Sequence, residues 1–231
     1  MKRFYKEVEV AELDGGWQVT LDGRGLKTAK GSPQIAPSCA LAEQLANEWS
    51  EQGEEIDPAR FILRDQADFA IDMVAPDPTE TINTLLGFAE TDTLCYRADP
   101  DEALYARQLE VWEPLLQSFE QRVGVQFVRV SGIIHKPQTP ETLQALRSRL
   151  EVKDAFALAG LQAATSLTAS LVIGMIAIED QADVQALWQA ASLEEEWQAD
   201  LWGRDEEAEQ RMAKREADFM NAVRFVSLAQ G

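Results

Sequence analysis

Residues 8–21 read VEVAELDGGWQVTL, a stretch in which apolar and polar side chains alternate on either side of Asp14-Gly15-Gly16. A period of two residues is typical of a half-buried β-strand. An Asp followed by two glycines supplies the positive φ angles that a tight hairpin turn requires. The stretch therefore predicts a β-hairpin, and a second turn at Asp22-Gly23-Arg24-Gly25 extends the strand-rich segment over residues 3–28. The alternating apolar positions are Val8, Val10, Trp17, Val19 and Leu21.

Helical spacing replaces this alternation farther along the chain. Pro37 and Ser38 are typical of a helix start, and Gly53 is a candidate C-cap for the same helix. A second helix is predicted over residues 65–74, and Ala75-Pro76-Asp77-Pro78 ends it, because proline disrupts a continuing helix. We place a domain boundary at this tetrapeptide. The first helix has an apolar face for the core, made of Leu41, Ala42, Leu45, Ala46 and Trp49.

Mostly helical patterns follow this boundary. Helices are predicted over residues 79–89 and 101–119, and Pro114 should kink the second or start a new segment. One isolated strand is expected around Val125, Phe127 and Val130, and Thr139-Pro140 opens another helix. The last helix is expected over residues 205–228, with a packing seam at Ala208, Met212, Arg215, Phe219, Ala222 and Val226. We therefore predict an α+β fold, with a small strand-rich α+β domain at residues 1–77 and a larger, mainly α-helical domain at residues 78–231.

Residues 155–178 contain no charged side chain, although they are long enough to span a bilayer. Polar residues interrupt the segment, its flanks are acidic, and it lacks an aromatic belt. The better prediction is a hairpin of two central helices, broken near Thr165–Thr168 and buried within the helical domain. The alternative is a membrane-associated factor.

The charge balance excludes some classes of partner. The chain of 231 residues carries 21 Lys and Arg against 40 Asp and Glu, a formal net charge of −19. Nucleic-acid binding needs a basic surface, and so does docking on anionic membranes. We therefore expect no nucleic acid partner and no membrane insertion. The excess acidity indicates either solubility alone or a partner with a basic or sticky surface.

Few residues are suited to catalysis. The chain has one histidine, His135, which cannot form a multi-histidine metal site. Cys39 and Cys95 are too few for a disulfide framework, and neither has a spacing that suggests a Cys–His nucleophile. We expect no catalytic residue, cofactor or metal ion. The start of the chain lacks the apolar run of a signal peptide, which favours a cytoplasmic, bacterial protein.

An acidic cluster with two tryptophans is the strongest candidate binding site. It runs from Leu193 to Asp205, and Trp197 lies four residues before Leu201, on one helical face. The tryptophans are either core residues beneath a solvated acidic face or anchors of a docking surface, where tryptophan is enriched. The candidate partner-binding residues are Glu194, Glu195, Trp197, Gln198, Trp202 and Asp205.

An ordered set of motifs carries a family resemblance over nearly the whole chain. The most specific segment is Phe88–Arg97, which reads FAETDTLCYR, and Gln108, Trp112 and Pro114-Leu115-Leu116 follow it. Gly16-Trp17-Gln18-Val19 lies near the start, and Trp197-Gln198 and Trp202-Gly203 lie near the end. With these motifs, the chain resembles the assembly chaperones of the F-type ATP synthase catalytic head, the family that handles the alpha subunit in mitochondria and alphaproteobacteria.

The resemblance implies a binding function without catalysis. A chaperone of this family holds the free alpha subunit, masks the apolar surface that beta later covers, and releases alpha without ATP when beta competes. The same resemblance implies a strand-rich domain followed by a helical one, a mitochondrial matrix location for eukaryotic relatives, and Glu195 as a residue of the alpha-binding surface.

We expect a monomer. The alternative is a metal-dependent hydrolase-type enzyme that uses the C-terminal acidic cluster. Asp92 and Arg97 are predicted to form a buried pair.

Overall fold

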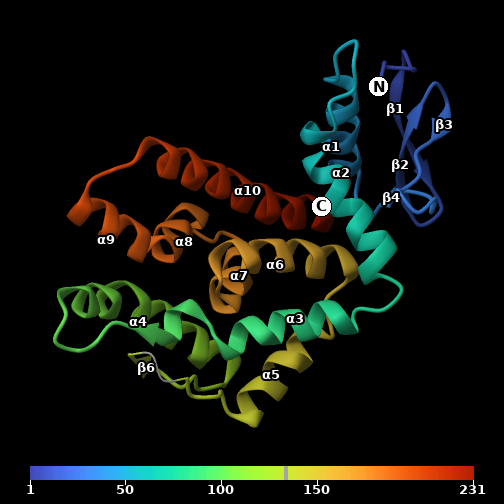
Figure 1. The fold of residues 1–231 in the computed structure, drawn as a ribbon. Coiled ribbons are helices and arrows are strands. Elements are labelled where there is room, and N and C mark those ends of the chain that lie inside the picture. The colour runs from blue at the N-terminus through green and yellow to red at the C-terminus, as the bar shows by residue number, and fades with distance from the viewer. Residues whose placement is uncertain (133–134) are drawn as a thin grey trace. The chain divides into compact units, whose positions relative to one another are not determined.

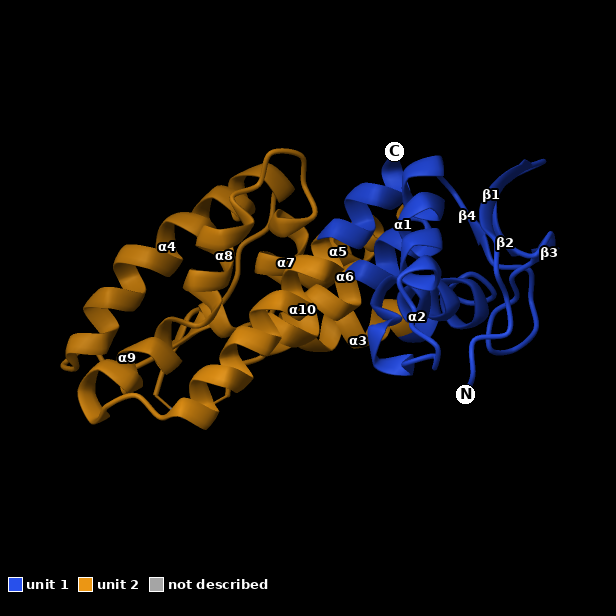
Figure 2. Ribbon diagram, turned by 90° about the horizontal axis from the view of Figure 1, so that it is seen from above, with its two compact units in different colours: residues 1–80, 154–160, 224–231 blue, residues 81–153, 161–223 orange. Residues whose placement is uncertain are grey.

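The computed structural model describes residues 1–132 and 135–231, which divide into two units (Figure 1, Figure 2). Unit 1 comprises residues 1–80, 154–160 and 224–231, and unit 2 comprises residues 81–153 and 161–223. All strands of the larger sheet lie in unit 1 within the described residues, whereas unit 2 is mostly helical. The predicted α+β class, with a strand-rich start and a helical remainder, is confirmed.

The hairpin predicted from residues 8–21 forms as β1 (Val8–Leu13) and β2 (Gly16–Leu21), which pair antiparallel. Two short strands, β3 (Arg24–Gly25) and β4 (Ile35–Ala36), pair with β2. A glycine is required at position 16, because a Cβ there would lie 2.4 Å from the carbonyl oxygen of Ala36. Val19 and Leu21 are buried, so the alternating pattern places its apolar face toward the core.

The first helix, α1 (Cys39–Ser50), covers β1 and β2 with its predicted apolar face (Figure 1). The Ser38 hydroxyl accepts a hydrogen bond of 3.0 Å from the backbone N–H of Leu41, which confirms this start of the helix. The prediction of Gly53 as the C-cap is wrong, because the helix ends at Ser50 with Glu51 as its cap. Trp49 is a core residue of unit 1, packed against Tyr5 and Phe61.

The second helix begins earlier than its pattern predicts. After a short 3₁₀ turn, η1 (Pro58–Arg60), it forms α2 (Ile62–Phe69) and continues as the π-helical segment η2 (Ala70–Val74). The Glu48 carboxylate accepts hydrogen bonds from the backbone N–H groups of Leu63 and Arg64, at 2.7 and 2.9 Å. A carboxylate at a helix N-terminus satisfies free N–H groups, so this residue of α1 caps α2 from a distance.

Unit 2 begins in α3 (Thr79–Glu90), followed by the 3₁₀ turn η3 (Thr93–Cys95). Its long helix α4 (Ala103–Val123) passes through Pro114 without ending, which corrects the prediction of a new segment there. Pro114 is exposed, and a proline on the solvent side of a helix leaves the buried face intact. The prediction of an isolated strand around residues 125–130 is largely wrong. Only β6 (Val130–Ser131) forms, and it pairs in parallel with β5 (Tyr96–Arg97).

The uncharged segment 155–178 forms the predicted pair of helices, α6 (Ala155–Thr168) and α7 (Leu171–Ala177). The chain reverses at Ala169, which has a φ of 49°. A Cβ at Gly174 would lie 2.4 Å from Oγ1 of Thr165, so glycine allows α7 to approach α6 closely. Across the described residues, no helix has the length and apolar character needed to cross a membrane.

The remaining helices complete unit 2, and the last one returns to unit 1. They are α5 (Pro140–Leu150), α8 (Val184–Ala191), α9 (Leu193–Trp202) and α10 (Glu206–Gln230). The predicted seam of α10 is only partly correct. Phe219, Ala222 and Val226 are buried, but Ala208 is exposed, because the first turns of α10 pack against little besides α9.

Candidate functional site

The candidate residues lie on α9 and at the start of α10, both in unit 2 (Figure 1). All ten residues of α9 are described, and Leu193 alone among them is buried. A helix with so little buried surface depends on polar contacts for its position. Three groups of such contacts hold α9, through Glu194, Glu195 and Arg204.

Glu194 connects α9 to the interior of α4. Its Oε1 accepts a hydrogen bond of 2.6 Å from Nε2 of Gln108, which is fully buried. One turn along α4, Nε1 of Trp112 donates to the carbonyl oxygen of Ala190 at 2.7 Å. Partial burial raises the pKa of Glu194, the Gln108 hydrogen bond opposes this rise, and the negative charge of Glu195 adds to it. Glu194 is therefore occupied by contacts within the chain.

Glu195 connects α9 to α10. Its Oε1 lies 2.6 Å from Nη1 of Arg215, and Nη2 of the same guanidinium donates to the carbonyl oxygen of Leu167 at 2.9 Å. The guanidinium carbon also lies 5.6 Å from the centre of the Trp188 ring, within the range of a cation–π contact. The sequence pattern predicts Arg215 only as a member of the packing seam of the last helix. An arginine at an apolar seam position is the signal that could have identified it as a partner for a neighbouring acid.

Arg204 holds the turn between α9 and α10. Its guanidinium lies within 3.0 Å of Glu196, 3.3 Å of Asp200 and 3.5 Å of Glu209. Gly203, with a φ of 95°, allows the chain to turn at the end of α9. Asp205 then starts α10, where its Oδ1 accepts a hydrogen bond of 2.9 Å from the backbone N–H of Ala208.

Trp202 is 82 % exposed and its neighbour Leu201 is 61 % exposed. The interpretation of Trp202 as a core residue is therefore wrong. The side chain borders a groove of about 610 Å³ between α9 and the first turns of α10, which we call the Trp202 groove. Its lining includes Glu195, Gln198, Ala199, Trp202, Ala208 and Met212.

Trp197 lies apart from this groove. It is half-buried and lines a second hollow with Arg107, Trp188 and Asp200, between α9 and helices α4, α8 and α10. The two tryptophans are five residues apart, which separates them by about 140° around a helix with 3.6 residues per turn. The structure thus brings Glu195, Gln198, Trp202 and Asp205 to one groove and places Trp197 on another face of α9.

In the segment of residues 88–97, Asp92 and Arg97 both make contacts within the chain that stabilise unit 2. The predicted Asp92–Arg97 pair does not form, because the two side chains bond to different parts of unit 2. Asp92 is fully buried, and its carboxylate accepts from the Ser170 hydroxyl at 2.7 Å and the Val172 N–H at 3.0 Å. Arg97 instead contacts Glu113 of α4 at 2.6 Å.

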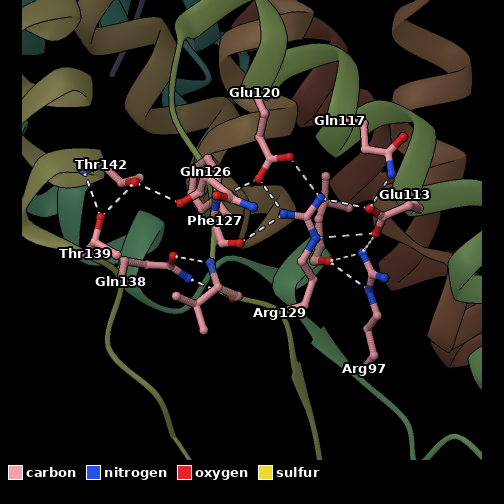
Figure 3. Close-up of polar contacts among 12 residues, drawn as sticks. Arg97, Glu113, Gln117, Glu120, Gln126, Phe127, Arg129, Gln138, Thr139 and Thr142 are labelled. Atoms are coloured by element: carbon pink, nitrogen blue, oxygen red, sulfur yellow. Dashed lines mark hydrogen bonds and ion pairs between the residues drawn. The ribbon is translucent and has the colours of Figure 1, made fainter.

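Arg97, Glu113, Glu120 and Arg129 form one ion-pair network that joins β5 and β6 to α4 (Figure 3). Arg129 lies 2.8 Å from Oε1 of Glu113 and also pairs with Glu120. Burial alone would raise the pKa of Glu113, but hydrogen bonds from Arg129 and Arg97 outweigh it and lower the pKa to about 2. These ion pairs hold α4 against the segments that carry Arg97 and Arg129, so the network has a structural role.

The residues considered for catalysis have other partners. Nδ1 of His135 lies 2.6 Å from the Tyr96 hydroxyl, and burial, with the nearby charge of Asp92, raises the pKa of the Cys95 thiol. Cys39 and Cys95 are both free thiols. Within the described part of the chain, no three His, Cys, Asp or Glu side chains are grouped so that they could hold a metal ion.

Comparisons with known proteins identify the class and the family. Residues 2–120 match the family described as ATP12 chaperone protein. Protein atp12, mitochondrial, of Schizosaccharomyces pombe is 27 % identical over 219 residues, which cover 90 % of this chain and 75 % of that protein. The crystal structure of Atp12 from Paracoccus denitrificans is 36 % identical with a TM-score of 0.92, and the match covers 99 % of this chain and 98 % of that one.

A further solved structure, of a chaperone candidate from Agrobacterium tumefaciens, is 38 % identical with a TM-score of 0.92 and covers 98 % of this chain and 85 % of that one. These matches place the protein among assembly chaperones and not among enzymes. The chain belongs to the ATP12 chaperone family, which confirms the resemblance found in its sequence motifs.

Proposed function

We propose that this protein binds the free alpha subunit of the F-type ATP synthase catalytic head and keeps it soluble until beta displaces it. Membership of the ATP12 chaperone family supports the proposal, and so does the exposure of Trp202. Free alpha presents the apolar surface that beta covers in the assembled head, and exposed apolar surface promotes aggregation. A soluble, acidic partner that covers this surface prevents that association.

The exposed Trp202 side chain is the observation that carries the proposal. A large aromatic side chain that is 82 % exposed, next to a leucine that is 61 % exposed, contributes little to the core of its own chain. Tryptophan is enriched among the residues that dominate binding energy at protein interfaces. We assign the alpha-binding surface to the Trp202 groove, with Trp202 as its apolar anchor and Gln198 and Asp205 beside it.

Co-expression with tagged alpha, and separately with tagged beta, from the same organism tests this function. We expect co-purification with alpha, more soluble alpha, and no complex with beta. A Trp202→Ala variant should lose most of the complex, whereas Val152→Ala, at a valine that is 84 % exposed on unit 2, should retain it. Recovery of beta and not alpha, or no complex with either subunit, would overturn the proposal.

Release without nucleotide is the second part of the function. Purified beta added to the complex should displace alpha in the absence of ATP, since beta competes for the same surface. Size-exclusion chromatography would follow the transfer of alpha from this protein to beta. A release that occurs only when ATP is added would contradict competitive displacement.

The proposed place of action is the compartment in which alpha is made. For this chain we propose the bacterial cytoplasm, and monomers in solution. Fractionation of cells that express the tagged chain, followed by sedimentation of the purified protein, tests both points.

A further inference from the structure

We propose that Arg215 is a positioning residue that sets α9 against α10, and that Glu195 acts on client binding through Arg215, not by touching the client. The inference rests on the proposed function and deepens it. The occupant that we assign to the Trp202 groove is a segment of the client that presents an apolar side chain beside a lysine or arginine.

The contacts of Arg215 are the first support. Its guanidinium bonds to Glu195 of α9 at 2.6 Å and to the Leu167 carbonyl of α6 at 2.9 Å, and it lies 5.6 Å from the centre of the Trp188 ring. Trp188 is itself buried against Phe219 of α10, with ring centres 5.7 Å apart. One side chain of α10 therefore connects the loosely packed helix α9 to the buried part of unit 2.

The position of Glu195 is the second support. Its carboxylate lies at the edge of the Trp202 groove, but it is already paired with Arg215. Replacing Glu195 by lysine would place two cations at the distance of a salt bridge, which repel each other. The repulsion moves α9 away from α10 and deforms the groove that both helices line.

Charge complementarity identifies the occupant. The groove has apolar walls that include Ala199, Trp202, Ala208 and Met212, and its charged lining is nearly balanced, with four acidic side chains and three arginines. The stretch around it is strongly negative, because residues 193–211 contain eight acidic and two basic side chains. An apolar segment that carries a cation matches both properties, because the acidic surface attracts the cation while apolar side chains cover Trp202. Another acidic segment would be repelled.

A charge-swap experiment separates positioning from direct contact. The variants Glu195→Lys and Arg215→Glu should each weaken the complex with alpha by about tenfold or more, and the combined Glu195→Arg/Arg215→Glu variant should recover most of the loss. Glu151→Lys changes the charge equally at an exposed site of unit 2 and should bind normally. A folded double variant that binds no better than the weaker single variant would overturn the inference, because Glu195 would then contact the client directly.

Hydrogen exchange tests the positioning role without any client. Backbone amides of residues 193–211 should exchange faster in each single charge-reversal variant and return toward the wild-type rate in the combined variant. Unchanged exchange in both single variants would overturn the role of Arg215. A protein that shows the expected exchange but binds no alpha would overturn the proposed function and leave Arg215 as a positioning residue.

Salt dependence tests the occupant. The affinity for alpha should fall as salt rises from about 50 to 500 mM, because salt screens the attraction between the acidic residues around the groove and a basic segment. An affinity that stays constant or increases with salt would show an uncharged apolar occupant and overturn this part of the inference.

Discussion

Nε2 of the buried Gln108 donates a hydrogen bond of 2.6 Å to Oε1 of Glu194, which joins the interior of α4 to the first turn of α9. The same amide accepts a hydrogen bond of 2.9 Å from the backbone N–H of Ala98 through its Oε1. One fully buried side chain thus connects the chain after β5, the helix α4 and the candidate binding helix.

Replacement of Gln108 by leucine should destabilise the protein. The change leaves the Ala98 N–H without its acceptor and the partly buried Glu194 without its donor, at a cost of about 1–3 kcal/mol. Urea unfolding measures this free energy. Gln121→Leu is the matched control on the exposed side of α4, and it should change stability by less than about 0.5 kcal/mol.

The same substitution to alanine should destabilise the protein strongly at Trp112 and hardly at all at Trp202. Trp112 is fully buried and donates to Ala190, so Trp112→Ala should cost about 3–5 kcal/mol of folding free energy. Trp202 is 82 % exposed, so Trp202→Ala should change stability by no more than about 0.5 kcal/mol. Thermal unfolding of the two variants distinguishes them, and a large loss of stability in Trp202→Ala would show that this side chain serves folding instead of binding.

Glu113 should make the protein sensitive to acid. Its pKa in the folded protein is about 2, below its ordinary value of 4.5, because hydrogen bonds from Arg129 and Arg97 outweigh the effect of burial. The stabilisation is fully present above the ordinary pKa and is lost as the pH falls from about 4.5 toward 2, a total of roughly 3 kcal/mol. Denaturant unfolding at several pH values should show that Glu113→Gln lowers stability at pH 7 and that the difference from the wild type shrinks in acid.

The control for this prediction is Glu110→Gln, at an exposed residue of the same helix that pairs only with Arg107 within the described chain. It should leave the pH profile unchanged. A Glu113→Gln difference that is constant between pH 7 and 3 would contradict the lowered pKa.

Asp92 should act over a different pH range and with the opposite sign. Burial raises its pKa to about 6, although hydrogen bonds from Val172, Ser170 and Leu94 act against this rise. A raised carboxyl pKa favours the protonated form in the folded state, so stability should increase as the pH falls from 6 toward 4. Asp92→Asn should abolish this increase, and it should also cost about 1–3 kcal/mol at pH 7, because the amide cannot accept from both Ser170 and Val172.

The Asp92 prediction is checked by unfolding the wild type and Asp92→Asn at pH 4, 5, 6 and 7. Parallel stability profiles for the two proteins would rule out a titration of Asp92 in this interval. Glu113 does not affect the comparison, because both proteins carry it and its contribution cancels in the difference.

Local patterns determined much of the fold. The alternation of residues 8–21 and the Asp-Gly-Gly turn determine the β1–β2 hairpin, because pleat and turn geometry depend on adjacent residues. The spacing of Leu41, Leu45 and Trp49 determines the buried face of α1, and the uncharged residues 155–178 determine a buried pair of helices. The ordered motifs also determined the family, and the acidic, tryptophan-containing stretch indicated the candidate site.

Only the tertiary structure decided which distant side chains meet. It paired Arg97 with Glu113 instead of Asp92, used Glu48 of α1 to cap α2, and placed Trp197 and Trp202 on different faces of α9. Above all, it brought Arg215 to Glu195, twenty residues away along the chain. Such pairings depend on how helices pack across long sequence separations, and no local period or turn motif encodes that packing.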